Sequence, residues 1–146
     1  MRVRKPHFAD YATAGLVYLL FGLFRLLPLD VSSALGARLV RCIGPFLKWH
    51  RIAESNLQRV WPQQTPAERN NILSGMWDNL GRTLAEYSWL NHPKLFSRIT
   101  YDDDSLRILT DAKHQGGAAI FIAGHLGNWE LSPLVSAKHG LPLALI

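Results

Sequence analysis

The chain has 146 residues, enough for one ordinary domain, and its single cysteine excludes a disulfide within the chain. The net charge of +5 is unevenly spread: residues 1–60 hold nine Lys/Arg and three Asp/Glu, whereas residues 61–146 hold seven and eight. A basic segment beside apolar helices indicates an anionic membrane surface as partner, while no helix-turn-helix, RNA-binding or zinc-finger pattern supports nucleic acid.

The first predicted segment, residues 1–30, is a basic N-terminus followed by an apolar helix. Between Asp10 and Asp30, Arg25 is the only charged residue. A membrane span needs about 20 mostly apolar residues, so the stretch is long enough only if Arg25 reaches the interface. We expect an uncleaved anchor, with a buried or interfacial helix as the alternative. The positive-inside rule would keep the N-terminus cytoplasmic, so a full span would put the following residues outside. This conflicts with a catalytic domain in the cytoplasm. A tilted, re-entrant or interfacial helix avoids the conflict.

The second predicted segment, residues 31–97, is helical. Pro28 should end the first helix, Asp30 should cap the next and Pro45 should kink it, while Cys42 should be a small core or membrane-facing residue rather than a nucleophile. Apolar and basic residues recur together at helical spacing: Leu35, Leu39, Ile43, Phe46 and Leu47, with Arg38, Arg41, Lys48 and Arg51. This basic amphipathic pattern is typical of a helix docked on a membrane, but also of a core helix with a solvated basic face, and both alternatives stay open.

A further helix in this segment has clear start signals. Thr65 can cap it, Pro66 suits the first helical position and Glu68 completes a capping box. The helix should run to about Leu90, and its predicted buried stripe consists of Ile72, Leu73, Met76, Trp77, Leu80, Leu84 and Tyr87. Three polar residues at i, i+3 and i+7 can face either a site or solvent: Asn79, Arg82 and Glu86.

The third predicted segment, residues 98–146, alternates strands and helices. Strands are expected at 99–101, at 118–123 and after Gly140, with helices at 106–114 and 129–139 between them. Asp102, Asp103 and Asp104 are expected to cap a helix rather than to bind a metal ion. This order predicts an α/β fold with a parallel sheet and right-handed crossovers, preceded by membrane-associated helices.

The most informative residues follow the predicted strand 118–123. His125 lies at the turn into the next helix, and Glu130 lies in the first or second turn of that helix, so the bend can bring their side chains together. Gly124 and Gly127 tolerate such a bend and let a substrate approach the backbone. A histidine beside a carboxylate can move a proton near neutral pH, and a helix N-terminus offers N–H groups to a developing oxyanion.

The segment GHLGNWE, residues 124–130, resembles the His-(four residues)-Asp/Glu motif of glycerolipid-type acyltransferases. Together with residues 53–90 and the basic, apolar N-terminus, it is most similar to the bacterial lipid A biosynthesis acyltransferases. The resemblance implies that His125 and Glu130 are catalytic. In the mechanism that we expect, backbone N–H groups near Gly127 and Asn128 help to bind the oxyanion, and these two residues are the candidate substrate-binding residues. The resemblance implies no metal ion and no organic cofactor. It also implies an inner-membrane enzyme with its catalytic part on the cytoplasmic side.

The resemblance further implies the substrates: a fatty acyl group on acyl carrier protein, and a hydroxyl of a Kdo-bearing lipid A precursor. The absence of a convincing Cys or Ser nucleophile fits direct attack of that hydroxyl. Two alternatives remain, namely another glycolipid acceptor such as mannosylated phosphatidylinositol, and an inactive membrane-associated fragment. The inactive fragment is an alternative because members of the family are roughly twice as long and the chain ends within a predicted strand. We therefore expect a truncated enzyme that holds the first half of the catalytic domain.

Overall fold

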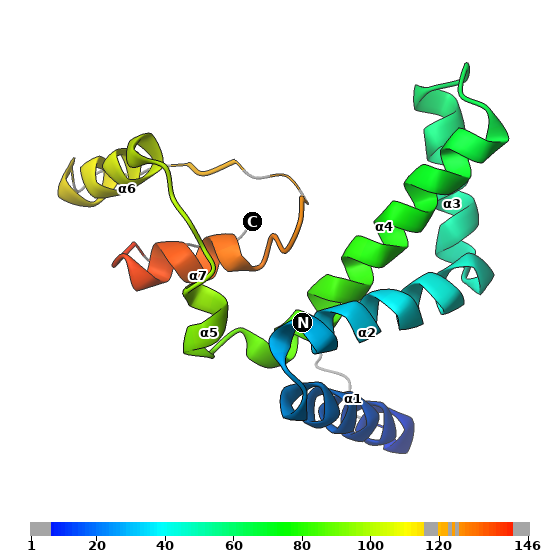
Figure 1. Ribbon diagram of the computed structural model, residues 1–146, viewed down its shortest axis with the longest axis horizontal. Helices are drawn as coiled ribbons and strands as arrows, with labels where there is room; N and C mark the ends of the chain where they lie inside the picture. Colours follow the sequence, from blue (N-terminus) through cyan, green and yellow to red (C-terminus); the bar gives the residue numbers. More distant parts are fainter. Residues whose placement is uncertain (1–6, 116–119, 123, 125, 142–146) are drawn as a thin grey trace. The chain divides into compact units, whose positions relative to one another are not determined.

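The computed structural model describes residues 7–115, 120–122, 124 and 126–141. The chain divides into two compact units, residues 1–89 and residues 90–146. In sequence order the first unit contains α1 (Phe8–Leu26), α2 (Leu29–Ile43), the 3₁₀ turn η1 (Gly44–Phe46), α3 (Lys48–Val60), α4 (Pro66–Glu86) and the 3₁₀ turn η2 (Tyr87–Trp89) (Figure 1). The second contains α5 (Pro93–Phe96), α6 (Asp103–Gln115) and α7 (Leu131–Lys138).

The predicted parallel sheet, and with it the α/β fold class, is wrong for the part of the chain that the structure describes. Residues 99–101 and 120–122 have no regular structure, and Ile120 and Ile122 are 91% and 95% exposed. Their β-branched, apolar composition suits a strand, but a strand exists only when its backbone pairs with a neighbour, and no such pairing occurs among the described residues. Residues 118, 119, 123 and 142–146 of the predicted strands lie outside the described residues.

Several predicted helix boundaries are confirmed. The first helix ends at Leu26, before Pro28, and the second ends at Ile43, so Pro45 does more than kink it. Asp30, however, does not cap α2: Pro28 occupies the N-cap, and Asp30 lies in the first turn, where its charge complements the helix dipole. In α4, Thr65 and Glu68 form the predicted capping box with Pro66 at the first position.

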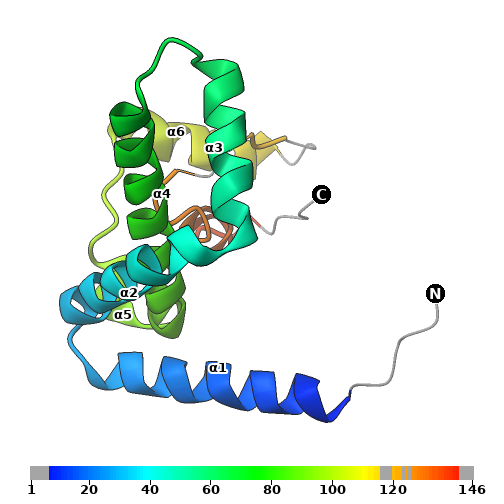
Figure 2. The ribbon, with the colours of Figure 1, turned by 90° about the vertical axis from the view of Figure 1, so that its right-hand side faces the viewer.

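The core of the first unit is the contact between α2 and α4, which lie side by side in Figures 1 and 2. A Cβ atom at Gly36 of α2 would come within 2.6 Å of the Ala85 Cβ, and one at Gly81 of α4 would come within 2.8 Å of the Ala37 Cα. The two helices therefore approach so closely that only glycine fits at these two positions.

This close approach changes which residues are buried. Of the predicted stripe of α4, Leu73 and Trp77 are buried; Leu80 and Tyr87 are half-buried, and Ile72, Met76 and Leu84 are exposed. The buried face of α2 consists of Leu29, Ser32, Ser33, Gly36 and Ala37. The prediction followed large apolar residues, whereas α2 and α4 pack through small ones, which permit the shortest distance between helix axes.

The apolar residues predicted for the second helix are consequently exposed. Leu35, Leu39 and Ile43 of α2 are 42%, 46% and 48% exposed, and Cys42 is exposed as well. Helix α2 packs against α4 through other residues, so a core helix with a solvated basic face stays an open alternative. Docking of this helix on a membrane stays a prediction.

Helix α3 packs against α4 beside this contact. The indole Nε1 of Trp77 donates a hydrogen bond to His50 Nδ1 at 3.0 Å, and Gly44 lies directly against the indole ring, where any side chain would collide with it. Trp77 is 3% exposed. It therefore joins α3, η1 and α4 through one side chain.

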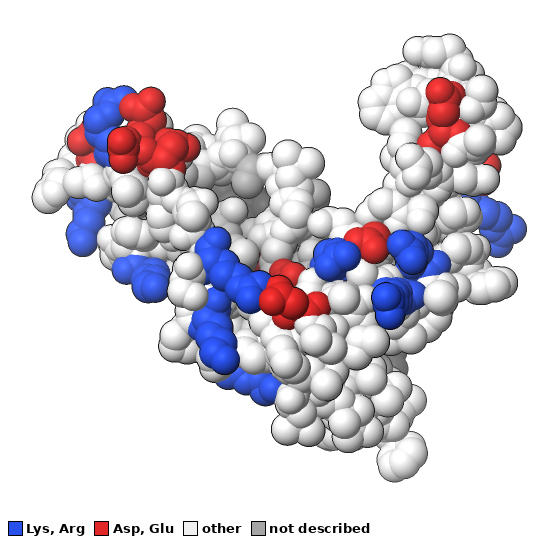
Figure 3. Space-filling model, in the orientation of Figure 1, with Lys and Arg blue, Asp and Glu red and all other residues white. Residues whose placement is uncertain are grey.

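Helix α1 has no buried residue, and by length and composition it is the one described helix that could cross a membrane. The uncharged, white surface over α1 in Figure 3 agrees with this. Its one basic residue, Arg25, points to the rest of the unit. Arg25 Nη1 donates to the carbonyl of Ser88 at 3.0 Å, and the guanidinium lies 4.7 Å from the centre of the Trp89 ring.

Candidate functional site

The loop before α7 carries the predicted site residues in the second unit. His125 lies outside the described residues, so its geometry toward Glu130 stays a prediction. Glu130 has helical backbone angles and occupies the N-cap of α7. It was expected to lie within this helix, but the helix begins one residue later, at Leu131. Its side chain is half-buried and makes no capping hydrogen bond. Within the described residues, no hydrogen bond or ion pair engages this carboxylate, so it is open to a partner.

Gly127 gives this loop its shape. Its φ of +57° lies in the left-handed region, which side chains other than glycine rarely adopt. Gly124, by contrast, has no such backbone angle, so of the two predicted glycines only Gly127 is required by conformation. A Cβ at Gly127 would meet nothing within 4 Å, so the requirement comes from the backbone and not from crowding.

The N-terminus of α7 supplies fewer N–H groups than expected. The N–H groups of Leu131 and Ser132 donate to the carbonyls of Asn128 and Trp129, each at 3.2 Å. Pro133 has no N–H group, and its place at the third helical position explains why the helix tolerates it. These three residues therefore offer no open donor to an oxyanion. An oxyanion would depend on the loop itself, as predicted for Gly127 and Asn128.

An apolar groove of about 370 Å³ begins directly after Glu130. It lies among α6, α7 and the segments 99–101 and 120–122, and its lining includes Ile99, Ile108, Leu109, Phe121, Leu131 and Val135. Two serines, Ser132 and Ser136, are on the α7 wall. This groove thus suits an apolar ligand better than a charged one.

The three consecutive acids act at the start of α6. The carboxylate of Asp102 accepts hydrogen bonds from the backbone N–H of Ser105 at 2.7 Å and from its hydroxyl at 3.0 Å. Both bonds favour the ionised form and hold the pKa of Asp102 below its ordinary value. Asp103 and Asp104 lie in the first helical turn. The capping role predicted for this acidic run is confirmed.

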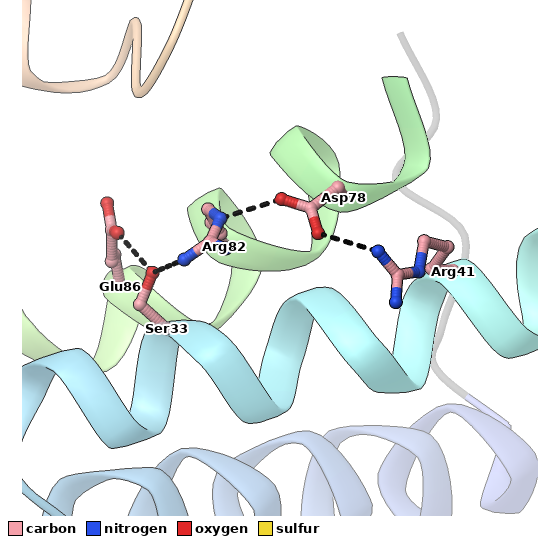
Figure 4. A network of polar contacts seen from close by, with 5 residues as sticks. All are labelled: Ser33, Arg41, Asp78, Arg82 and Glu86. Carbon is pink, nitrogen blue, oxygen red and sulfur yellow. Dashed lines mark hydrogen bonds and ion pairs between the residues drawn. The ribbon is translucent and has the colours of Figure 1, made fainter. Parts of the chain in front are cut away.

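A second polar constellation lies between α2 and α4 in the first unit (Figure 4). Asp78 accepts from Arg82 Nε at 2.7 Å and lies 3.6 Å from Arg41 Nη1. Ser33 Oγ donates to Glu86 at 2.8 Å and accepts from Arg82 Nη1 at 3.5 Å. Figure 3 shows the resulting alternation of acidic and basic side chains along these two helices.

The sequence indicated only part of this network. Arg82 and Glu86 were noted for their spacing with Asn79, and Arg41 only as part of a basic face. The pairing of Asp78 with Arg82 four residues later is a signal that was present in the sequence. Ser33 and Arg41 could not be assigned to it, because their roles depend on how α2 lies against α4.

The comparisons with known proteins give one match. The profile of the family "Bacterial lipid A biosynthesis acyltransferase" matches residues 2–146, almost the whole chain. Neither the search of curated proteins nor the search of solved structures returns a match. The resemblance stated from the sequence is confirmed: the chain belongs to the bacterial lipid A biosynthesis acyltransferase family, and it is an acyltransferase.

Proposed function

We propose that this acyltransferase moves a fatty acyl group from acyl carrier protein to a hydroxyl of a lipid A precursor, with His125 as general base. Membership of the family supports the reaction class. The observation that carries the site is the half-buried residue Glu130, which lies five residues after His125 and directly before Leu131, a residue that lines an apolar groove. A half-buried carboxylate without a partner in the described residues suits the role of orienting an imidazole.

The proposed reaction is a direct transfer. A ring nitrogen of His125 takes the proton of the acceptor hydroxyl while the hydroxyl oxygen attacks the thioester carbonyl. The C–S bond then breaks, the carrier thiol leaves with the proton, and the new ester remains on the acceptor. Glu130 orients the imidazole and stabilises its charged form, and N–H groups near Gly127 and Asn128 bind the oxyanion.

We further propose that the protein works at the inner membrane, with its catalytic part on the cytoplasmic side. Support comes from the exposed apolar helix α1 and from the basic excess of residues 1–60. Acyl carrier protein and a lipid acceptor would meet at that surface. The alternative is that the enzyme acylates another glycolipid, such as mannosylated phosphatidylinositol. Identification of the product distinguishes the two acceptors.

The test is acyl transfer by the chain in detergent micelles, with acyl carrier protein thioester and lipid A precursor, and products identified by mass spectrometry. His125→Ala should lower kcat by about 100- to 10,000-fold, because general-base catalysis contributes that much. Glu130→Gln should lower it less, since the base remains. His114→Ala, at an exposed position of α6, is the matched control and should keep full activity. Full activity of His125→Ala would refute the assignment.

A further inference from the structure

A polar pocket of about 470 Å³ lies between α2 and α4 in the first unit. Arg41 contributes to it from α2. The α4 side consists of residues that recur along one face of that helix: Asn71, Ser74, Gly75, Asp78, Asn79 and Arg82. The lining contains no large apolar side chain, which distinguishes this pocket from the groove beside Glu130. The lining therefore suits a polar ligand.

The pocket holds two guanidinium groups close together. Asp78 pairs with both of them, through one carboxylate oxygen each, at 3.6 Å from Arg41 and 2.7 Å from Arg82. The carboxylate relieves the repulsion between the two cations, and the residues that line the pocket keep a net charge of +1. Glu86, which Ser33 links to Arg82, lies outside this lining. Each guanidinium has five N–H donors, so most of these donors remain for another acceptor.

Stability explains little of this arrangement. The side chains of Arg41 and Arg82 are 51% and 45% exposed, and ion pairs at such exposure contribute about 0–1 kcal/mol at most. The contact between α2 and α4 already depends on the close packing at Gly36 and Gly81. Two arginines held in a fixed orientation at an open pocket are better explained by a ligand.

The chemistry of the lining specifies the ligand. Paired guanidinium groups recognise phosphate through several parallel N–H···O bonds, and uncharged donors such as Asn71 and Ser74 can add to these. A Cβ at Gly75 would meet nothing within 4 Å, so the pocket has room beside the arginines. We propose that this pocket binds the phosphate group of a phosphorylated sugar headgroup on the lipid acceptor, an inference that rests on the proposed function.

The experiment titrates the whole chain in detergent micelles with glucosamine 1-phosphate, glucosamine and inorganic phosphate at constant ionic strength. The readout is the ¹H–¹⁵N NMR signals of the Arg82 Nε–H and the Asn71 side-chain amide. Glucosamine 1-phosphate should shift both signals saturably, glucosamine should not, and inorganic phosphate should bind more weakly. Equal binding of inorganic phosphate would overturn the headgroup assignment, and absence of a saturable shift would overturn the pocket.

Variants separate recognition from structure. Asn71→Asp places a negative charge in the pocket at an exposed residue that holds no helix in place, and should weaken phosphate binding about ten-fold. Asn56→Asp, at an exposed position of α3, makes the same change elsewhere and should leave binding unchanged. Arg82→Gln should weaken binding by at least a similar factor, with Arg82→Lys partly restoring it; circular dichroism checks that both fold.

Equal effects of Asn71→Asp and Asn56→Asp would show a general charge effect and refute the site. The assay is independent of acyl transfer, so His125→Ala should bind glucosamine 1-phosphate normally. If the chain binds glucosamine 1-phosphate but does not transfer the acyl group, the proposed function has failed. If it transfers the acyl group but does not bind glucosamine 1-phosphate, the phosphate pocket has failed.

Discussion

At the scale of single residues, the clearest interactions are those within a few positions of one another. Thr65 and Glu68 show this at the start of α4. The Thr65 hydroxyl accepts from the Glu68 N–H at 3.3 Å, and the Glu68 carboxylate accepts from the Thr65 N–H at 2.7 Å. Both partners were identified from the sequence, because a capping box needs only two residue types at a fixed spacing.

The capping box predicts a pH-dependent stability. Hydrogen bonds from the backbone N–H and hydroxyl of Thr65 hold the pKa of Glu68 below its ordinary value. The pKa of Glu68 is therefore lower in the folded than in the unfolded state. The ionised carboxylate contributes fully to the free energy of unfolding at a pH above the ordinary carboxyl pKa, and this contribution is lost as the pH falls through the lowered pKa. Glu68→Gln keeps an amide that can cap but removes the charge.

The measurement is urea unfolding of the chain and of Glu68→Gln across that acidic range. The variant should be less stable at neutral pH, and the difference in the free energy of unfolding should shrink as the pH falls. Thr65→Ala should cost about 1 kcal/mol at neutral pH. A difference between the chain and Glu68→Gln that stays constant with pH would contradict the charge-based explanation.

At the scale of helices and strands, the decisive feature is the glycine contact between α2 and α4. Which face of a helix is buried depends on what packs against it. In the contact between α2 and α4, the small residues Gly36 and Gly81 are buried, whereas the larger Leu35 and Leu84 of the same helices are exposed. The expectation from apolar periodicity failed for this reason, although it located both helices.

The contact predicts opposite effects for two Gly-to-Ala changes in α4. Gly81→Ala adds a Cβ that would lie within 2.8 Å of the Ala37 Cα, so α2 must move away, at a cost of about 1–3 kcal/mol. Gly75→Ala adds a Cβ to open space and should stabilise the helix by about 0.5–1 kcal/mol through lower entropy of the unfolded chain. Thermal unfolding compares the two, and a Gly81→Ala protein as stable as Gly75→Ala would refute the close packing.

At the scale of the whole molecule, each unit is best considered by itself. The first holds the apolar helix α1 and most of the basic excess, and the second holds the loop with Glu130. The apolar stretch was expected to be long enough for a membrane span only if Arg25 reaches the interface, and this stays a prediction. In the structure Arg25 contacts Ser88 and Trp89 of η2, so the end of α1 is attached to the first unit by its own cation.

This attachment predicts a loss of stability when the cation is removed. Arg25→Gln abolishes the cation–π contact with Trp89 and weakens the hydrogen bond to Ser88, which should together cost about 1–2 kcal/mol. Hydrogen exchange in micelles should become faster at η2 and at the end of α1. Arg59→Gln, at an exposed position of α3, is the control and should change neither quantity. Equal exchange in both variants would show that Arg25 does not hold α1.

The sequence by itself determined what depends on neighbouring residues: the start of α4, the end of α1 before Pro28, an irregularity at Pro45, the capping by Asp102 and the family to which the chain belongs. These follow from caps, prolines and a motif, each of which acts over a few residues. Only the tertiary structure decided which faces are buried, where Arg25 and Arg41 point, and that residues 99–101 and 120–122 do not pair as strands. Burial and strand pairing require a second segment from elsewhere in the chain, and its position is not contained in the local pattern.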